Sequence, residues 1–314
     1  MSLRTSFSGR LTGVRLRQEV IMENLKLSGC GTALVTPFRN GEVDYEVYAG
    51  LVDRQVAAGI HFLVPLGTTG ETPCLDVREK LKILEITKDH CKGKPVIVGG
   101  GTNSLVQTLK GISELETYGP DAYLIVVPYY NKPTQEGMYE YFKAVAGATD
   151  KGIVLYNVPG RTGANLKAET TLRLAEIPNI IAIKEASGNY SQISEIIRNA
   201  PEGFSVLSGN DEETLPLMAT GADGIISVAS NIDPEDMVRM TEALLQDDIV
   251  TARRLHLKLM PLFRNCFVES NPIPVKAGMA ALGLMENEFR LPLCPASQST
   301  YELMEKTVKE LELK

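Results

Sequence analysis

The leading candidate for a catalytic residue in this sequence is a lysine at the end of an apolar stretch. Residues 179–188 read NIIAIKEASG, and Lys184 follows the apolar run 180–183. One interpretation is a surface lysine whose stem packs while its ammonium reaches water. The other is a desolvated amine that forms a Schiff base with a carbonyl substrate. The second requires a neutral amine, and burial favours that form because it lowers the pKa of a lysine from about 10.4.

The element that carries this lysine is one of eight short apolar runs, each followed by a turn and an amphipathic segment. The runs occupy residues 31–36, 61–66, 95–100, 122–127, 152–157, 180–185, 204–209 and 224–229. They are rich in β-branched residues and do not alternate with polar ones, as expected of parallel strands buried on both faces. Eight strand–helix units in about 200 residues predict a closed (β/α)8 TIM barrel.

An open doubly wound sheet is the alternative, and it would carry a glycine-rich phosphate loop after its first strand. The segment 36–44 reads TPFRNGEVD and has no such pattern. After the eighth run, residues 234–314 read as further helices, which is more than one barrel helix needs. We therefore expect an N-terminal extension over 1–28, the barrel over 29–245 and a helical C-terminal extension over 246–314.

Among the amphipathic segments, residues 76–91 are predicted to form a helix that begins after Asp76 as its N-cap. The apolar stripe predicted for this helix consists of Val77, Leu81, Leu84 and Ile86.

The composition argues against several classes of function. A net charge of -7 gives no reason to expect nucleic acid as a partner, and no apolar stretch approaches the roughly 20 residues that cross a bilayer. The three histidines have no metal-ligand spacing, and the five cysteines are scattered without a C-x-x-C pattern. We therefore expect no metal site and no disulfide framework, but reduced thiols in a cytoplasmic protein.

The first 21 residues differ from the rest, being rich in Arg, Ser and Thr with Glu19 as their acid. This composition resembles an organellar transit peptide. We favour the alternative that it is a tag remnant or follows an upstream start codon, with Met22 as the natural beginning.

Polar residues at the ends of the predicted strands are the candidates for an active site, because TIM barrels hold theirs at the carboxyl ends of the strands. They are Thr68, Thr69, Glu71, Tyr129, Tyr130, Asn131, Tyr156, Asn157, Arg161, Thr162, Lys184, Glu185, Ser208, Gly209, Asn210, Ile226 and Ser227. One lysine among several hydroxyls and one arginine, without paired carboxylates, suits imine chemistry better than metal-assisted or glycosidic hydrolysis. Structural alternatives remain, since Tyr156 could be a core aromatic and Arg161 a solvated loop residue.

The motifs GTTGE, PYYN, YNVPGRTG, IKEASGN and SGND stand in this order at the ends of the predicted strands. Together with NPIPVK (271–276), they resemble those of the dihydrodipicolinate synthase family, from about residue 30 to the end. The resemblance implies a pyruvate-dependent class I aldolase that condenses pyruvate with L-aspartate-4-semialdehyde, on the route to diaminopimelate and lysine. It also implies no metal or organic cofactor and a homotetramer built from two tight dimers.

Four residues match the family's catalytic positions. The resemblance implies that Lys184 forms the imine with pyruvate and that Tyr156 passes protons during its formation. Thr68 and Tyr130 match the other members of a hydroxyl relay, and in the family this second tyrosine enters from a neighbouring subunit.

Four further residues match substrate-binding positions. Thr69 matches the threonine that holds the carboxylate of pyruvate, and the backbone at Ile226 and Gly209 are expected to line the same pocket. Arg161 matches the arginine that binds the carboxylate of aspartate semialdehyde, for which a guanidinium fork is well suited.

Two alternatives stay open. Another pyruvate-dependent aldolase, such as N-acetylneuraminate lyase or a 2-keto-3-deoxy sugar-acid aldolase, would share the lysine and the tyrosine, but GTTGE and the arginine of GRTG favour the synthase. A catalytically retired barrel that binds ligands is less consistent with the presence of Lys184, Tyr156 and Tyr130.

Inhibition by L-lysine can also be addressed, because lysine-sensitive relatives bind the inhibitor at the tight dimer interface. The matching positions are Thr72, Pro73, Val77, Lys80, Asn103, Gln107 and Tyr129. Sensitive enzymes carry histidine or glutamate where this chain has Lys80 and Gln107. A second cation would repel the ammonium of bound lysine, so we expect weak inhibition or none.

Overall fold

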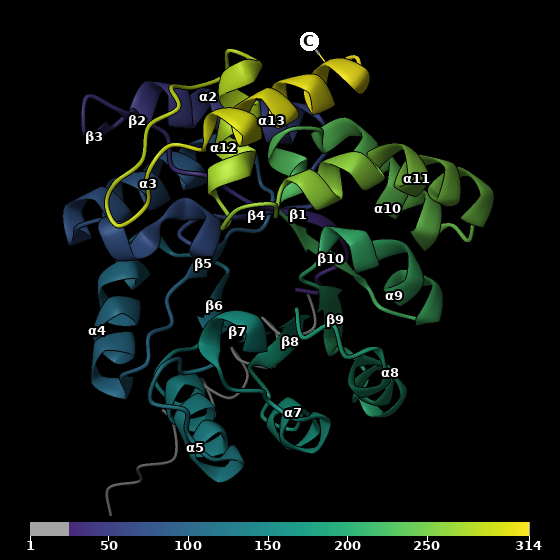
Figure 1. Ribbon diagram of the computed structural model, residues 1–314. Coiled ribbons are helices and arrows are strands. Elements are labelled where there is room, and N and C mark those ends of the chain that lie inside the picture. The colour runs from purple at the N-terminus through teal and green to yellow at the C-terminus, as the bar shows by residue number, and fades with distance from the viewer. Residues whose placement is uncertain (1–24, 314) are drawn as a thin grey trace, which may run out of the picture.

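The computed structural model of the protein describes residues 25–313 (Figure 1). The interpretation of the first 21 residues as a tag remnant or a targeting segment lies outside the described residues. Within 25–313, no helix is long and apolar enough to cross a membrane.

Eight parallel strands form one sheet that curves into a barrel (Figure 1). They are β1 (Gly29–Ala33), β4 (Phe62–Val64), β5 (Ile97–Gly99), β6 (Ala122–Val126), β7 (Gly152–Asn157), β8 (Ile180–Glu185), β9 (Ser205–Ser208) and β10 (Gly224–Ser227). Their order is β4-β1-β10-β9-β8-β7-β6-β5, and a bridge between Leu63 and Val96 joins the two ends. The predicted TIM barrel is confirmed. Each predicted run overlaps one strand, the first run being displaced toward the C-terminus.

Helices follow the strands and surround the barrel. They are α2 (Tyr45–Ala57), α3 (Val77–His90), α4 (Leu105–Leu115), α5 (Gln135–Ala146), α6 (Pro159–Thr162), α7 (Ala168–Ala175), α8 (Tyr190–Asn199), α9 (Thr214–Thr220) and α10 (Pro234–Leu245). Three more helices complete the described chain, namely α11 (Ile249–Asn265), α12 (Ile273–Ala281) and α13 (Gln298–Glu310). Helix α13 packs against both α11 and α12, and Figure 1 shows this group, in yellow-green and yellow, gathered at one side of the barrel. The predicted helical extension is therefore present.

Helix α3 begins as predicted, but its apolar stripe was wrong in part. The carboxylate of Asp76 accepts a hydrogen bond from the backbone N–H of Glu79, whose carboxylate accepts one from the backbone N–H of Asp76. This reciprocal capping box fixes the start of the helix. The buried residues of the helix are Ile83, Leu84, Ile86 and Thr87. Val77 is 43% exposed because the first turn of the helix lines an open groove instead of packing on the barrel.

Apolar side chains fill the interior of the barrel below the ends of its strands. Phe62, Ile97 and Ile226 are fully buried in this interior cluster. A Cβ atom at Gly31 would lie 2.0 Å from the ring of Phe62, so the glycine makes room for that ring. The filled interior leaves the carboxyl ends of the strands as the place where a cavity can form.

Candidate functional site

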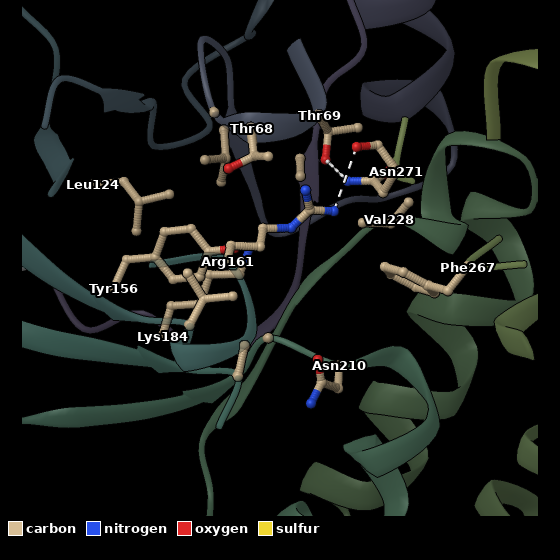
Figure 2. Close-up of a pocket in the computed structure, with 16 residues that line it drawn as sticks. Thr68, Thr69, Leu124, Tyr156, Arg161, Lys184, Asn210, Val228, Phe267 and Asn271 are labelled. Carbon is tan, nitrogen blue, oxygen red and sulfur yellow. Dashed lines mark hydrogen bonds between the residues drawn. The ribbon is translucent and has the colours of Figure 1, made fainter. Parts of the chain in front are cut away.

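A cavity of about 50 Å³ lies at the carboxyl ends of the barrel strands (Figure 2). Among the residues predicted from the sequence, Thr68, Thr69, Tyr156, Arg161, Lys184, Gly209 and Asn210 line it. Other lining residues include Leu124, Val158, Val228, Phe267 and Asn271. The structure thus brings together residues from six different strand ends and from the connection between α11 and α12.

Lys184 lies at the bottom of this cavity and is 5% exposed. The parallel pairing of β7 and β8 sets Tyr156 directly beside Lys184, and the lysine Nζ lies 4.4 Å from the centre of the tyrosine ring. A Cβ atom at Gly209 would lie 3.1 Å from Cε of Lys184, so a larger residue there would press on the amine stem. Such burial excludes the interpretation of Lys184 as a solvated surface lysine.

The two threonines of GTTGE lie on a single turn of 3₁₀ helix, Thr68–Gly70, that follows β4. The hydroxyl of Thr36 donates to the carbonyl oxygen of Gly70 at 2.8 Å, which holds the end of the turn. Thr69 is buried and Thr68 exposed, so the two hydroxyls face different surroundings. The hydroxyl oxygen of Thr69 accepts a hydrogen bond from Nδ2 of Asn271 at 3.0 Å.

Below this turn lies a fully buried ion pair that joins the barrel to the C-terminal extension. Nζ of Lys276 in α12 donates to Oε1 of Glu71 at 2.5 Å and to the carbonyl oxygen of Thr36 at 3.0 Å. Burial lowers the pKa of Lys276 to about 8, and the attraction of Glu71 opposes that shift. Glu71 directly follows the turn and has φ +52°, so the pair holds a left-handed residue next to the threonines.

Arg161 lies in the short helix α6, which begins at Pro159 directly after β7. Its side chain is exposed at the mouth of the cavity, and Figure 2 shows it extending toward Thr69 and Asn271. Nη2 of Arg161 donates to the carbonyl oxygen of Asn271 at 3.4 Å. Among residues 25–313 the other donors of the guanidinium have no hydrogen-bond partner, so they can bind an anion at the mouth of the cavity.

Two of the eight residues that match the family's catalytic and substrate-binding positions do not line the cavity. Tyr130 follows β6 with φ +71° and is 88% exposed, so its ring points away from the protein surface. Ile226 is fully buried in the barrel interior on β10, and Val228 lines the cavity two residues later.

Two buried carboxylates next to the cavity accept hydrogen bonds from the protein. Glu185 accepts hydrogen bonds from Asn157 and Gln192, and burial raises the pKa of its carboxyl above the usual range. Asp211 accepts from Ser227 and from the backbone of Val228, and burial raises the pKa of this carboxyl as well. Since both are occupied by protein donors, we assign them to the support of β8 and β10 and not to the chemistry. Within residues 25–313, no group of three or more His, Cys, Asp or Glu side chains could hold a metal ion.

A groove of about 580 Å³ adjoins the cavity and shares Thr68, Tyr156 and Arg161 with it. It is lined by most of the positions that match the lysine-binding residues of sensitive relatives, namely Thr72, Pro73, Val77, Lys80, Gln107 and Tyr129. Asn103 does not line it, and its carbonyl oxygen accepts from Nδ2 of Asn131. Lys110 also lines the groove, where its ammonium lies 3.8 Å from the carboxylate of Glu114.

Sequence reasoning missed the contribution of the C-terminal extension to the cavity. Asn271 and Phe267 line it, and Lys276 supports the GTTGE turn. The motif NPIPVK contains Asn271 and Lys276 and could have indicated this contribution, but it was used only as part of the resemblance to the family.

Comparison with known proteins gives one consistent result. The model of the dihydrodipicolinate synthetase family matches residues 26–311. The 4-hydroxy-tetrahydrodipicolinate synthase of Fervidobacterium nodosum is 51% identical over 286 residues, which cover 90% of this chain and 98% of the relative. The crystal structure of dihydrodipicolinate synthase from Thermotoga maritima has a TM-score of 0.91 and 46% identity, covering 92% of this chain and 100% of that one. A monomeric variant of dihydrodipicolinate synthase has a TM-score of 0.90, also at 46% identity, covering 92% and 98%. The chain therefore belongs to the dihydrodipicolinate synthetase family and is an enzyme of the lyase class.

Proposed function

We propose that this enzyme condenses pyruvate with L-aspartate-4-semialdehyde through a Schiff base at Lys184, as a 4-hydroxy-tetrahydrodipicolinate synthase of diaminopimelate and lysine biosynthesis. One observation carries the proposal. The amine of Lys184 is buried in a cavity at the strand ends, beside the ring of Tyr156 and opposite Thr69 and Arg161. The family membership and the relatives' names support the choice of substrates.

The chemistry begins with attack of the neutral lysine amine on the ketone carbon of pyruvate. Loss of water gives an imine, and the hydroxyls of Tyr156 and Thr68 supply and remove the protons that these steps require. The protonated imine withdraws electrons and makes the methyl group acidic, so a proton leaves and an enamine forms. The enamine carbon then attacks the aldehyde of the second substrate.

Two groups bind the two carboxylates in this proposal. The hydroxyl of Thr69, whose oxygen already accepts from Asn271, is free to donate to the carboxylate of pyruvate. Arg161 at the mouth of the cavity binds the carboxylate of the semialdehyde through parallel N–H···O bonds.

The proposal includes a homotetramer of two tight dimers in the cytoplasm. Its support is Tyr130, which is exposed on its own subunit and would reach the hydroxyl relay only of a neighbouring one. Exposed apolar side chains lie nearby, among them Val77 on α3 and Val106 on α4, and a second subunit would cover them.

A substrate panel tests the assignment within the family. With pyruvate present, the enzyme should turn over L-aspartate-4-semialdehyde and show little cleavage of N-acetylneuraminate or of a 2-keto-3-deoxy sugar acid. A preference for either sugar acid would refute the synthase function while leaving the Schiff base untouched.

Replacing Arg161 with alanine should separate the two substrates. We expect kcat/KM for the semialdehyde to fall roughly 10- to 100-fold or more, the scale of one charge-assisted contact of about 1.5–3 kcal/mol. Trapping of the pyruvate imine with borohydride should stay nearly intact, since Thr69 binds that carboxylate. The matched variant Arg161→Lys should recover little, because an ammonium cannot copy the guanidinium fork. Normal kinetics with the semialdehyde would contradict this role.

Inhibition by L-lysine is expected to be weak or absent. Lys80 lines the groove in which a lysine would have to bind, and Gln107 offers it no negative charge. The carboxylate of Glu114, which also lines the groove, already faces the ammonium of Lys110 at 3.8 Å. A dose–response curve at saturating pyruvate measures the effect. The double variant Lys80→His/Gln107→Glu should increase sensitivity, because it removes one cation and adds one anion. Half-inhibition of the unaltered enzyme below about 1 mM, within the usual range of metabolite binding, would overturn this prediction.

A further inference from the structure

Asn271 lies where the two carboxylate-binding groups of the proposed site meet. It precedes α12, is 6% exposed and lines both the cavity and the adjoining groove. Its side-chain Nδ2 donates to the hydroxyl of Thr69 at 3.0 Å, and its backbone oxygen accepts from Nη2 of Arg161 at 3.4 Å. One residue thus contacts the group that holds pyruvate and the group that holds the semialdehyde.

The side-chain oxygen of Asn271 has no such partner. Among residues 25–313, Oδ1 of Asn271 is buried and accepts no hydrogen bond from the protein. Buried polar atoms in proteins nearly always have a partner, so an orphan oxygen beside a cavity requires an explanation. A turned amide would let the hydroxyl of Thr69 donate to Oδ1, but the single proton of that hydroxyl would then not be available for the carboxylate of pyruvate, so the proposed function requires the orientation in which Nδ2 donates. A carbonyl oxygen only accepts, so the group that completes it must be a donor.

The second substrate carries such a donor. In L-aspartate-4-semialdehyde the α-ammonium is bonded to the carbon that bears the carboxylate. Once Arg161 binds the carboxylate, the ammonium therefore lies within a few ångströms of the guanidinium, where Asn271 also lies. An ammonium also needs acceptors to offset the repulsion of the nearby arginine.

We propose that Oδ1 of Asn271 accepts an N–H from the α-ammonium of the second substrate, so that Asn271 selects an α-amino aldehyde over its analogue without the amino group. This inference rests on the proposed function, since it assumes that Arg161 binds the semialdehyde. It makes Asn271 a specificity residue supplied by the C-terminal extension. The alternative is that Asn271 only positions Thr69, in which case it would act on pyruvate alone.

Two unreactive analogues test the proposal on the unaltered enzyme. L-homoserine has the carboxylate and the ammonium of the substrate with a hydroxyl in place of the aldehyde, and 4-hydroxybutyrate lacks only the ammonium. Each is measured as a competitive inhibitor against L-aspartate-4-semialdehyde at saturating pyruvate. We expect homoserine to bind roughly 10-fold or more tightly than 4-hydroxybutyrate, the scale of one hydrogen bond to a charged group. Equal inhibition by the two would overturn the proposal without any variant.

A pair of variants then assigns the preference to Asn271. Asn271→Leu keeps the approximate shape and removes both polar atoms, and the ratio of the two inhibition constants should approach one. Thr69→Val removes the hydroxyl to which Asn271 donates but leaves Oδ1 of Asn271 in place. This variant should weaken trapping of the pyruvate imine and keep the ratio of the two inhibition constants. If a folded Asn271→Leu enzyme keeps the ratio of inhibition constants found for the wild type, another group binds the ammonium.

These outcomes are distinct from failure of the proposed function. If the enzyme does not turn over L-aspartate-4-semialdehyde in the substrate panel, the function itself is wrong. If the enzyme does turn over L-aspartate-4-semialdehyde but homoserine binds no more tightly than 4-hydroxybutyrate, the proposed function stands and the proposed role of Asn271 is wrong.

Discussion

Replacing Lys184 with alanine is expected to lower turnover by about 10⁴-fold or more, since the variant loses the covalent path altogether. No other buried amine lines the cavity, within the part of the chain that the structure describes, to take over the imine. Pyruvate followed by borohydride should leave an alkyl adduct on the peptide that contains Lys184, measured by mass spectrometry. The variant should show no adduct at all.

A surface lysine provides the matched control. Lys167 is exposed and lies just before α7, so Lys167→Ala should keep both the adduct and the turnover. Tyr156→Phe keeps the ring against which the lysine amine lies and removes the hydroxyl. It should slow the appearance of the adduct without moving it to another residue. An adduct elsewhere, or none in correctly folded wild-type enzyme, would mean that Lys184 does not form the imine.

Replacing Lys276 with methionine is expected to give the largest loss of stability among the changes considered. Methionine fills a similar volume but leaves the carboxylate of Glu71 fully buried without its cation. Removing one partner of a buried pair typically costs about 3–5 kcal/mol, because the remaining charge is uncompensated. Urea unfolding followed by circular dichroism measures the change.

The double variant Lys276→Met/Glu71→Gln separates charge from packing. It removes both charges, so it should recover a large part of the lost stability, in keeping with buried pairs that can be replaced by neutral groups. If the double variant is as unstable as Lys276→Met, the loss comes from packing against Phe38 and Phe289, whose rings lie 4.5 and 4.3 Å from the ammonium.

The sequence predicts the barrel and the Lys184 side of the cavity well because both depend on local patterns. A buried parallel strand is a continuous apolar run, and parallel strands bring their carboxyl ends to one face. Lys184 and Tyr156 each stand at such an end, so their pairing across β7 and β8 follows from the fold class alone.

The other side of the cavity could not be predicted in this way. Asn271 meets Thr69 across 202 residues of sequence, and Lys276 meets Glu71 across 205. No periodicity or spacing near NPIPVK indicates which turn of the barrel it will touch. Tyr130 is a third case, since its place after a strand does not reveal that a left-handed backbone turns it outward, and only the resemblance to the family indicated that it points to a neighbouring subunit. The apolar stripe predicted for α3 was wrong at Val77 because this residue lines the adjoining groove instead of packing against the barrel. Its sequence position does not indicate that groove.

The contacts of Asn271 and Lys276 with the GTTGE turn have a consequence for the synthesis of the enzyme. Lys184 and Thr69 are both made long before Asn271 and Lys276 leave the ribosome. A nascent chain can therefore close much of its barrel while the turn that carries Thr69 still lacks its hydrogen bond and Glu71 still lacks its cation. Ribosome-bound intermediates that end before residue 271 should be unable to hold pyruvate correctly. Binding of pyruvate through Thr69 therefore requires that nearly the whole polypeptide has been made.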